Sequence, residues 1–179
     1  MDLIYNHSMK NQDPSQEQLQ SVLNLYTHGK LQQALSESSQ MLERFPNSVV
    51  LHNISGASNA ALKRFDAAID SYQQALRIKP DYAEVHNNMG SVMKDKGDLE
   101  QAIESYQQAL RIKPDYAVAH NNMAKAMKDK GDLNEAIDSF KQAIQIKPDY
   151  AAAYNNLGIA LKDKGDLNEA IDSFKQAIQ

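Results

Sequence analysis

Three histidines recur at a spacing of 34 residues and are the first candidates for metal ligands: His52, His86 and His120. A zinc ion needs each ligand within about 2.1 Å, whereas neighbouring units of a stacked helical array stand about 10 Å apart. Tyr154 occupies the next place in this row, which favours a role in the helix core. The chain has no cysteine, so disulfides, thiolate zinc sites and cysteine nucleophiles are excluded. We therefore expect no metal and no cofactor.

No arrangement of residues indicates catalysis. The chain contains no Gly-rich phosphate loop, no Gly-x-Ser-x-Gly elbow and no His-Glu-x-x-His helix. Its recurring carboxylates fit helix N-caps better than acid/base pairs; they are Asp81, Asp98, Asp132 and Asp166. We predict that the chain is not an enzyme.

A second set of polar residues suits peptide binding rather than chemistry. Asparagines form two rows at the same spacing, Asn53, Asn87, Asn121 and Asn155 in one and Asn88, Asn122 and Asn156 in the other. Asparagine is a mediocre helix former, and its amide offers donors and an acceptor that match peptide N–H and C=O groups. Such a ladder would hold an extended main chain and be largely blind to its side chains. The alternative is that the asparagines bridge neighbouring helices or were copied by duplication.

Lysines accompany these asparagines. Lys94, Lys128 and Lys162 form a flanking row, while Ser91 and Lys125 lie in the central stripe beside Asn88 and Asn122. The cations suggest a carboxylate-bearing peptide. Asp95, Asp129 and Asp163 each follow a lysine and offset its charge, so a solvated face is the alternative interpretation.

The spacing of the prolines and glycines predicts the repeating units that position these rows of asparagines and lysines. Pro46, Pro80, Pro114 and Pro148 lie 34 residues apart, as do Gly97, Gly131 and Gly165. This grid predicts a flexible N-terminal tail over 1–13 and an array over 14–179, with units 15–48, 49–82, 83–116, 117–150 and an incomplete 151–179. Residues 129–145 recur letter for letter as 163–179, which indicates duplication or consensus design.

Each unit contains two apolar stripes of helical period. His86, Met89, Gly90 and Met93 form one stripe, and Leu99, Ala102, Ile103 and Tyr106 begin the next. Gly97 can end the first helix in the left-handed conformation, and Asp98 can cap the second. The two-residue turn predicts an antiparallel helical hairpin whose core holds Tyr72, Tyr106, Phe140 and Phe174.

These residues resemble the tetratricopeptide repeat (TPR) family. The quoted pattern is Tyr154, Leu157, Gly158 and Leu161 on one helix, with Ala170 and Phe174 on the next. The small residue lets the helix axes approach to about 8 Å. Unit 15–48 departs most, at Gln18, Ser21, Val22 and Ser38.

The resemblance implies an all-α solenoid of about five αα-hairpins, a right-handed superhelix whose first helices line a concave groove. The row Asn88, Asn122 and Asn156 also resembles the asparagine ladder in the TPR superhelix of O-linked N-acetylglucosamine transferases. This second resemblance implies promiscuous, backbone-directed peptide binding.

The composition limits the classes of partner and the cellular location that we expect. The net charge is −4, with 19 basic against 23 acidic residues, which disfavours nucleic acid. The mean hydropathy is −0.60, and no run of about 18 apolar residues predicts a membrane span. Without a secretory signal in residues 1–10, we expect a cytoplasmic location.

Three functions remain open. The first is a non-catalytic interaction module that binds an extended protein segment through the asparagine ladder. The second is the substrate-recruiting N-terminal fragment of a larger transferase. The third is a self-assembling scaffold, because Ile171, Phe174 and Ile178 belong to a last helix with no following unit to cover them.

Overall fold

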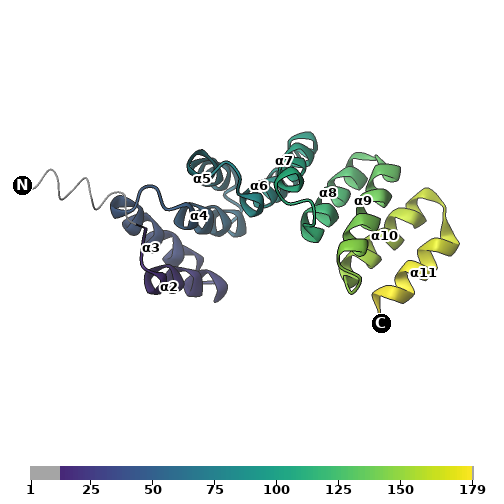
Figure 1. Cartoon of the computed structure of the whole chain (residues 1–179), viewed down its shortest axis with the longest axis horizontal. Coiled ribbons are helices and arrows are strands. Elements are labelled where there is room, and N and C mark those ends of the chain that lie inside the picture. Colours follow the sequence, from purple (N-terminus) through teal and green to yellow (C-terminus); the bar gives the residue numbers. More distant parts are fainter. Residues whose placement is uncertain (1–12, 179) are drawn as a thin grey trace, which may run out of the picture. The chain divides into compact units, whose positions relative to one another are not determined.

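All regular secondary structure in the residues that the computed structural model describes, 13–178, is α-helical (Figure 1). The helices are α2 (Gln16–Thr27), α3 (Leu31–Arg44), α4 (Val49–Ala61), α5 (Phe65–Ile78), α6 (Ala83–Lys96), α7 (Leu99–Ile112), α8 (Ala117–Lys130), α9 (Leu133–Ile146), α10 (Ala151–Lys164) and α11 (Leu167–Ala177). Apart from Asp13, the expected tail lies outside the described residues. No helix within 13–178 has both the length and the apolar character that crossing a membrane requires.

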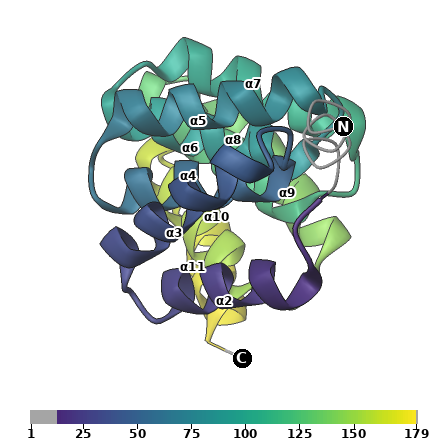
Figure 2. The same ribbon diagram turned by 90° about the vertical axis from the view of Figure 1, so that its left-hand side faces the viewer.

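The chain divides into two compact parts, 13–92 and 93–178, and the division falls within α6. In the N-terminal part, α3 contacts both α2 and α4 and lies between them in Figure 2, while α2 also contacts α4 directly. In the C-terminal part, each of α8 to α11 packs on the helix before it, and α8 also contacts α10. Each part therefore places first helices of successive hairpins side by side.

Glycine ends the first helices as the sequence predicts. Gly97, Gly131 and Gly165 have φ values of +95°, +101° and +98°, which L side chains rarely adopt. The N–H of Gly131 donates to the carbonyls of Met127 and Lys128, and the N–H of Asp132 donates to Met127 at 2.9 Å. These bonds satisfy the last carbonyls of α8 and fix the two-residue turn into α9.

The predicted aspartate caps are wrong. Asp98, Asp132 and Asp166 occupy the N-cap positions, but none of their side chains bonds a backbone N–H of the helix. The carboxylate of Asp132 instead pairs with the Lys130 ammonium at 3.1 Å, and this hydrogen bond raises the pKa of Lys130. Asp81 is not a cap either, because α6 begins two residues later, at Ala83.

A complete capping box forms at Ser15, which was not among the predicted caps. The Ser15 hydroxyl accepts from the Gln18 N–H at 3.2 Å, and the Gln18 side-chain oxygen accepts from the Ser15 N–H at 2.9 Å. Gln18, one of the departures from the family pattern, thus has a structural role at the start of α2.

Small residues face aromatic rings where the paired helices cross. A Cβ added to Gly56 would lie 2.5 Å from Tyr72 Cε1, and one added to Gly158 would lie 2.7 Å from Phe174 Cε1. Tyr72, Tyr106 and Phe140 are at most 2% exposed, which confirms them as hairpin core, whereas Phe174 is half-buried. The predicted close approach at glycine is therefore confirmed.

Candidate functional site

The expected binding residues lie on the first helices α4, α6, α8 and α10. In the N-terminal part, Asn88 Nδ2 donates to Asn53 Oδ1 at 3.3 Å, which links α6 to α4. In the C-terminal part, Asn156 Nδ2 donates to Asn121 Oδ1 at 3.0 Å, which links α10 to α8. The same bond thus recurs between residues 35 apart and joins consecutive first helices.

The asparagines differ in exposure. Asn87 and Asn121 are only 5% exposed, so most of each side chain is covered. Asn53, Asn88, Asn122 and Asn156 are half-buried, and Asn155 is exposed. The half-buried amides are the ones that both neighbouring helices and solvent can reach.

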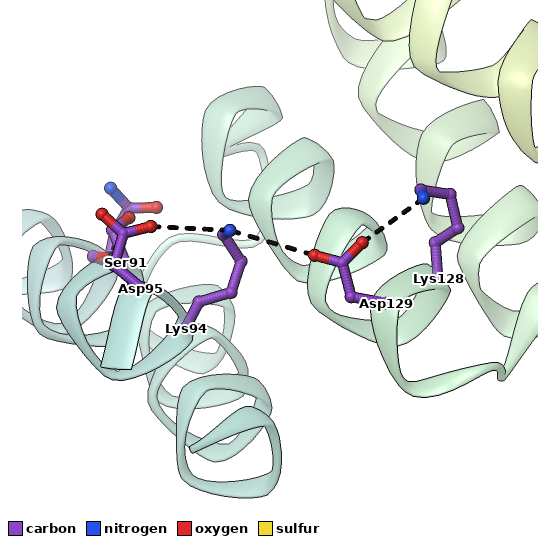
Figure 3. Close-up of polar contacts among 6 residues, drawn as sticks. Ser91, Lys94, Asp95, Lys128 and Asp129 are labelled. Atoms are coloured by element: carbon purple, nitrogen blue, oxygen red, sulfur yellow. Dashed lines mark hydrogen bonds and ion pairs between the residues drawn. The ribbon is translucent and has the colours of Figure 1, made fainter. Parts of the chain in front are cut away.

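Two of the four candidate lysines are held by aspartates (Figure 3). Lys94 Nζ lies 3.6 Å from Asp95 and 3.9 Å from Asp129, and Lys128 Nζ lies 3.3 Å from Asp129. Asp129 therefore connects the last turn of α6 to the last turn of α8. The aspartates therefore offset the charge of Lys94 and Lys128 in the described residues, whereas no ion pair joins Lys162 to Asp163 there.

The remaining candidate residues with charged or hydroxyl side chains either form no ion pair or bond to the backbone of their own helix. Within residues 13–178, neither the half-buried Lys125 nor the exposed Lys162 has an ion pair. The Ser91 hydroxyl donates to the carbonyl oxygen of Asn87 at 3.1 Å. Lys125 and Lys162 are thus the cations best placed to meet a carboxylate.

The histidines hold the loops between hairpins. The Nε2 atoms of His52, His86 and His120 lie 2.9, 2.9 and 3.0 Å from the carbonyl oxygens of Pro46, Pro80 and Pro114. Each imidazole is half-buried and donates from Nε2 when that nitrogen carries the proton. Among the described residues, no group of three or more His, Cys, Asp or Glu side chains could hold a metal ion.

One feature of this face was missed in the sequence. A pocket of about 610 Å³ lies between α2 and α4, lined by Gln16, Glu17, Leu19, Gln20, Leu23, Val50, Asn53 and Ile54. Leu19 stands 34 residues before Asn53, and Ile54 stands 34 before Asn88. Apolar residues at the start of both asparagine rows were the signal that could have revealed it.

Comparison with known proteins agrees with this architecture. A TPR repeat model matches residues 59–97, 90–131 and 126–165, which together cover more than half of the chain. No curated protein sequence matches the chain.

Several solved structures share the fold. A crystal structure of MamA is 26% identical over 87% of this chain and 91% of its own, with a TM-score of 0.78. PilF of Pseudomonas aeruginosa is 19% identical over 90% of this chain and 75% of its own, with a TM-score of 0.82. YrrB, a TPR protein with an unusual peptide-binding site, is 20% identical over 94% of this chain and 87% of its own, with a TM-score of 0.71. With its helical hairpins and its repeat matches, the chain is an all-α TPR solenoid and belongs to the TPR repeat family.

Proposed function

We propose that the chain is a non-catalytic interaction module that holds an extended segment of a partner protein along its first helices. The asparagine rows make the contacts with the partner's main chain. Family membership supports a protein-binding role, and YrrB offers a precedent for a peptide-binding site on such a repeat array.

The observation that carries the proposal is the hydrogen bond within each asparagine pair. Because Asn156 Nδ2 donates to Asn121 Oδ1, the Asn156 amide has a fixed orientation. Its Oδ1 has no hydrogen bond to any other described residue, and neither has Asn53 Nδ2 in the other pair. A half-buried acceptor and a half-buried donor are thus oriented before any peptide arrives, which lowers the entropic cost of binding.

The spacing of the helices suits an extended peptide. Neighbouring first helices that pack directly stand about 10 Å apart, and an extended chain advances about 3.3 Å per residue. The two amides of one pair would therefore meet the peptide about three residues apart. Lys125 and Lys162 favour a peptide that also carries acidic side chains.

Paired asparagines that only join helices would show the same two hydrogen bonds, so binding must be measured. Peptides selected from a random 12-residue library on the wild-type chain would be titrated by fluorescence polarisation. With three hydrogen bonds of about 0.5–1.5 kcal/mol each, the Asn88→Ala/Asn122→Ala/Asn156→Ala variant should bind at least tenfold more weakly. The matched control is Gln73→Ala/Gln107→Ala, at exposed positions of α5 and α7, which should bind normally.

A second measurement leaves the protein unaltered. Methylation of backbone nitrogens in the selected peptide should abolish binding, whereas single side-chain changes to alanine should have little effect. Equal binding by the triple variant and wild type, or indifference to N-methylation, would rule out the ladder.

Self-association is a second candidate, favoured by the exposed face of α11. Ile171 is 52% exposed, although Ile137, in the same 17-residue sequence one repeat earlier, is 4% exposed. The neighbouring Leu167 is 59% exposed. A second copy of the chain could bury both side chains.

Sedimentation velocity at several concentrations tests this candidate. Association should weaken in Ile171→Lys, while Gln176→Lys adds the same charge to the same helix as a control. A monomer at every concentration would exclude self-association.

A further inference from the structure

The pocket between α2 and α4 differs from the rest of the first-helix surface. Leu23 and Val50 are each 39% exposed on its walls, and Leu19 and Ile54 complete its apolar lining. At the positions of Leu23 and Val50, α6 carries the polar residues Ser91 and Glu84. Its volume of about 610 Å³ falls within the range of cavities that bury a ligand of several apolar groups.

From this pocket and the residues that precede it, we propose that it holds the chain's own residues 3–5, Leu-Ile-Tyr. Five of the first twelve residues are apolar: Met1, Leu3, Ile4, Tyr5 and Met9. They supply side chains of the kind that the pocket walls require.

The connection to the pocket is short. The described chain starts at Asp13, and Gln16 and Glu17 in the first turn of α2 already line the pocket. Gln16 to Leu23 spans only about 10 Å of helix, whereas the eight residues from Tyr5 to Asp13 can reach about 26 Å. A tether of this length gives an effective concentration on the order of millimolar.

The pocket and the proposed occupant both carry few charged side chains. Glu17 is the one charged residue in the lining, and Lys10 is the one lysine or arginine in residues 1–12. Because Asp2 lies next to the docked residues, the acidic and basic side chains of the segment offset each other, and docking rests on the apolar side chains and the short tether. Asn53 lines the pocket and also accepts the Asn88 hydrogen bond, so the docked segment competes with a partner peptide at this end of the asparagine row.

The test uses the full chain, which has no tryptophan. A single Tyr5→Trp reporter should emit at shorter wavelength than a solvent-exposed tryptophan, because the pocket excludes water from the indole. The change Leu23→Ser/Val50→Glu should return the emission to longer wavelength. It places residues of α6 at partly exposed positions of α2 and α4, so the fold should be retained.

The control is Val118→Glu, at a position of α8 that is 41% exposed and equivalent to Val50. It should leave the emission unchanged. Solvent-like emission from the Tyr5→Trp chain, or no response to the pocket change, would overturn the proposal. A shift that appears only at high protein concentration would also overturn it and would identify a second copy as the occupant.

A competition measurement is independent of any partner. A synthetic peptide of residues 1–12 should bind the Leu3→Ser/Ile4→Ser/Tyr5→Ser chain about tenfold more tightly than the wild-type chain, if its own dissociation constant is near 0.1 mM. Equal affinity for both chains would overturn docking. Neither of these two readouts uses the library-selected peptides. A negative result for docking therefore does not contradict the proposed function, and a negative result for the asparagine ladder does not contradict docking.

Discussion

Lys63 takes the place that glycine occupies in the equivalent turns. Its φ is +61°, a left-handed conformation that costs a non-glycine residue roughly 1–2 kcal/mol. Gly29, Gly97, Gly131 and Gly165 adopt positive φ at the corresponding positions. The Lys63 ammonium lies 5.7 Å from the centre of the Phe65 ring, an exposed contact that offsets about 0.5 kcal/mol of this strain.

Replacing Lys63 by glycine should therefore raise the free energy of unfolding by about 0.5 kcal/mol. The reverse exchange, Gly131→Lys, should lower it by about 1 kcal/mol, because no residue lies within 4 Å of that Cβ and the strain is purely in the backbone. Urea unfolding followed by circular dichroism measures both changes. A loss of stability in Lys63→Gly would contradict the argument from strain.

The buried hydroxyl of Tyr72 predicts a response to alkaline pH. Burial, with a smaller contribution from Tyr26, raises the pKa of Tyr72 well above its usual value of 10. Above pH 10 the unfolded chain loses this proton and the folded chain keeps it, so stability is intact below pH 10 and falls as pH rises. The loss should reach about 1.4 kcal/mol at pH 11.

Tyr72→Phe isolates this effect, because phenylalanine occupies the equivalent position in α9 as Phe140. Urea unfolding of the variant between pH 8 and pH 11 should show a smaller loss of stability than wild type. The same slope in both proteins would mean that other groups cause the alkaline sensitivity.

The crossing of two helices within a hairpin depends on one pair of side chains. Gly56 faces Tyr72 in α4 and α5, whereas α8 and α9 accommodate Ala124 opposite Phe140, both fully buried. In α2 and α3 the larger and the smaller residue change places. Val22 on the first helix takes the position of the glycine, and Ser38 on the second takes the position of the aromatic residue; both are 0% exposed. The departures of the first hairpin from the family pattern are therefore complementary in volume.

Gly56→Ala should destabilise the chain by about 1–3 kcal/mol, because the new methyl group would lie 2.5 Å from a ring that is 2% exposed. Ala124→Gly should cost about 1 kcal/mol through helix propensity and a small void. Thermal or urea unfolding measures both. A neutral Gly56→Ala would show that the Tyr72 ring moves freely, contrary to the packing described.

Period and residue size were enough to predict the helices, the glycine turns and the aromatic core. The aspartate caps failed because a two-residue turn holds Asp132 at φ −81° and ψ 67°, and its carboxylate pairs with Lys130 instead of the helix N–H groups. The Asn88–Asn53 bond joins residues 35 apart, so it depends on the offset of packed helices. The pocket depends on that same packing. It also depends on Leu19 and Ile54, two apolar residues at positions where later repeats carry asparagine, so a search for the repeat pattern passes over them.

Over the whole molecule, stability is a sum of neighbouring contacts. In each compact part, helices pack on the next helix or the next but one, as in other repeat proteins. Opening free energy should therefore vary along the chain and depend on what covers each helix. Two identical segments allow this dependence to be measured without any difference in composition.

Residues 129–145 and 163–179 have the same sequence, so their amides have the same intrinsic exchange chemistry. α10 packs on α9 and covers Ile137, whereas Ile171 and Leu167 of α11 remain more than half exposed. The missing burial is worth about 1–2 kcal/mol, so amides of α11 should exchange roughly five- to thirtyfold faster than those of α9. Residue-resolved hydrogen exchange by NMR distinguishes the two copies, which mass spectrometry of identical peptides would not. Equal protection in dilute solution would contradict nearest-neighbour stabilisation, while protection of α11 that rises with protein concentration would show that a second copy covers this face.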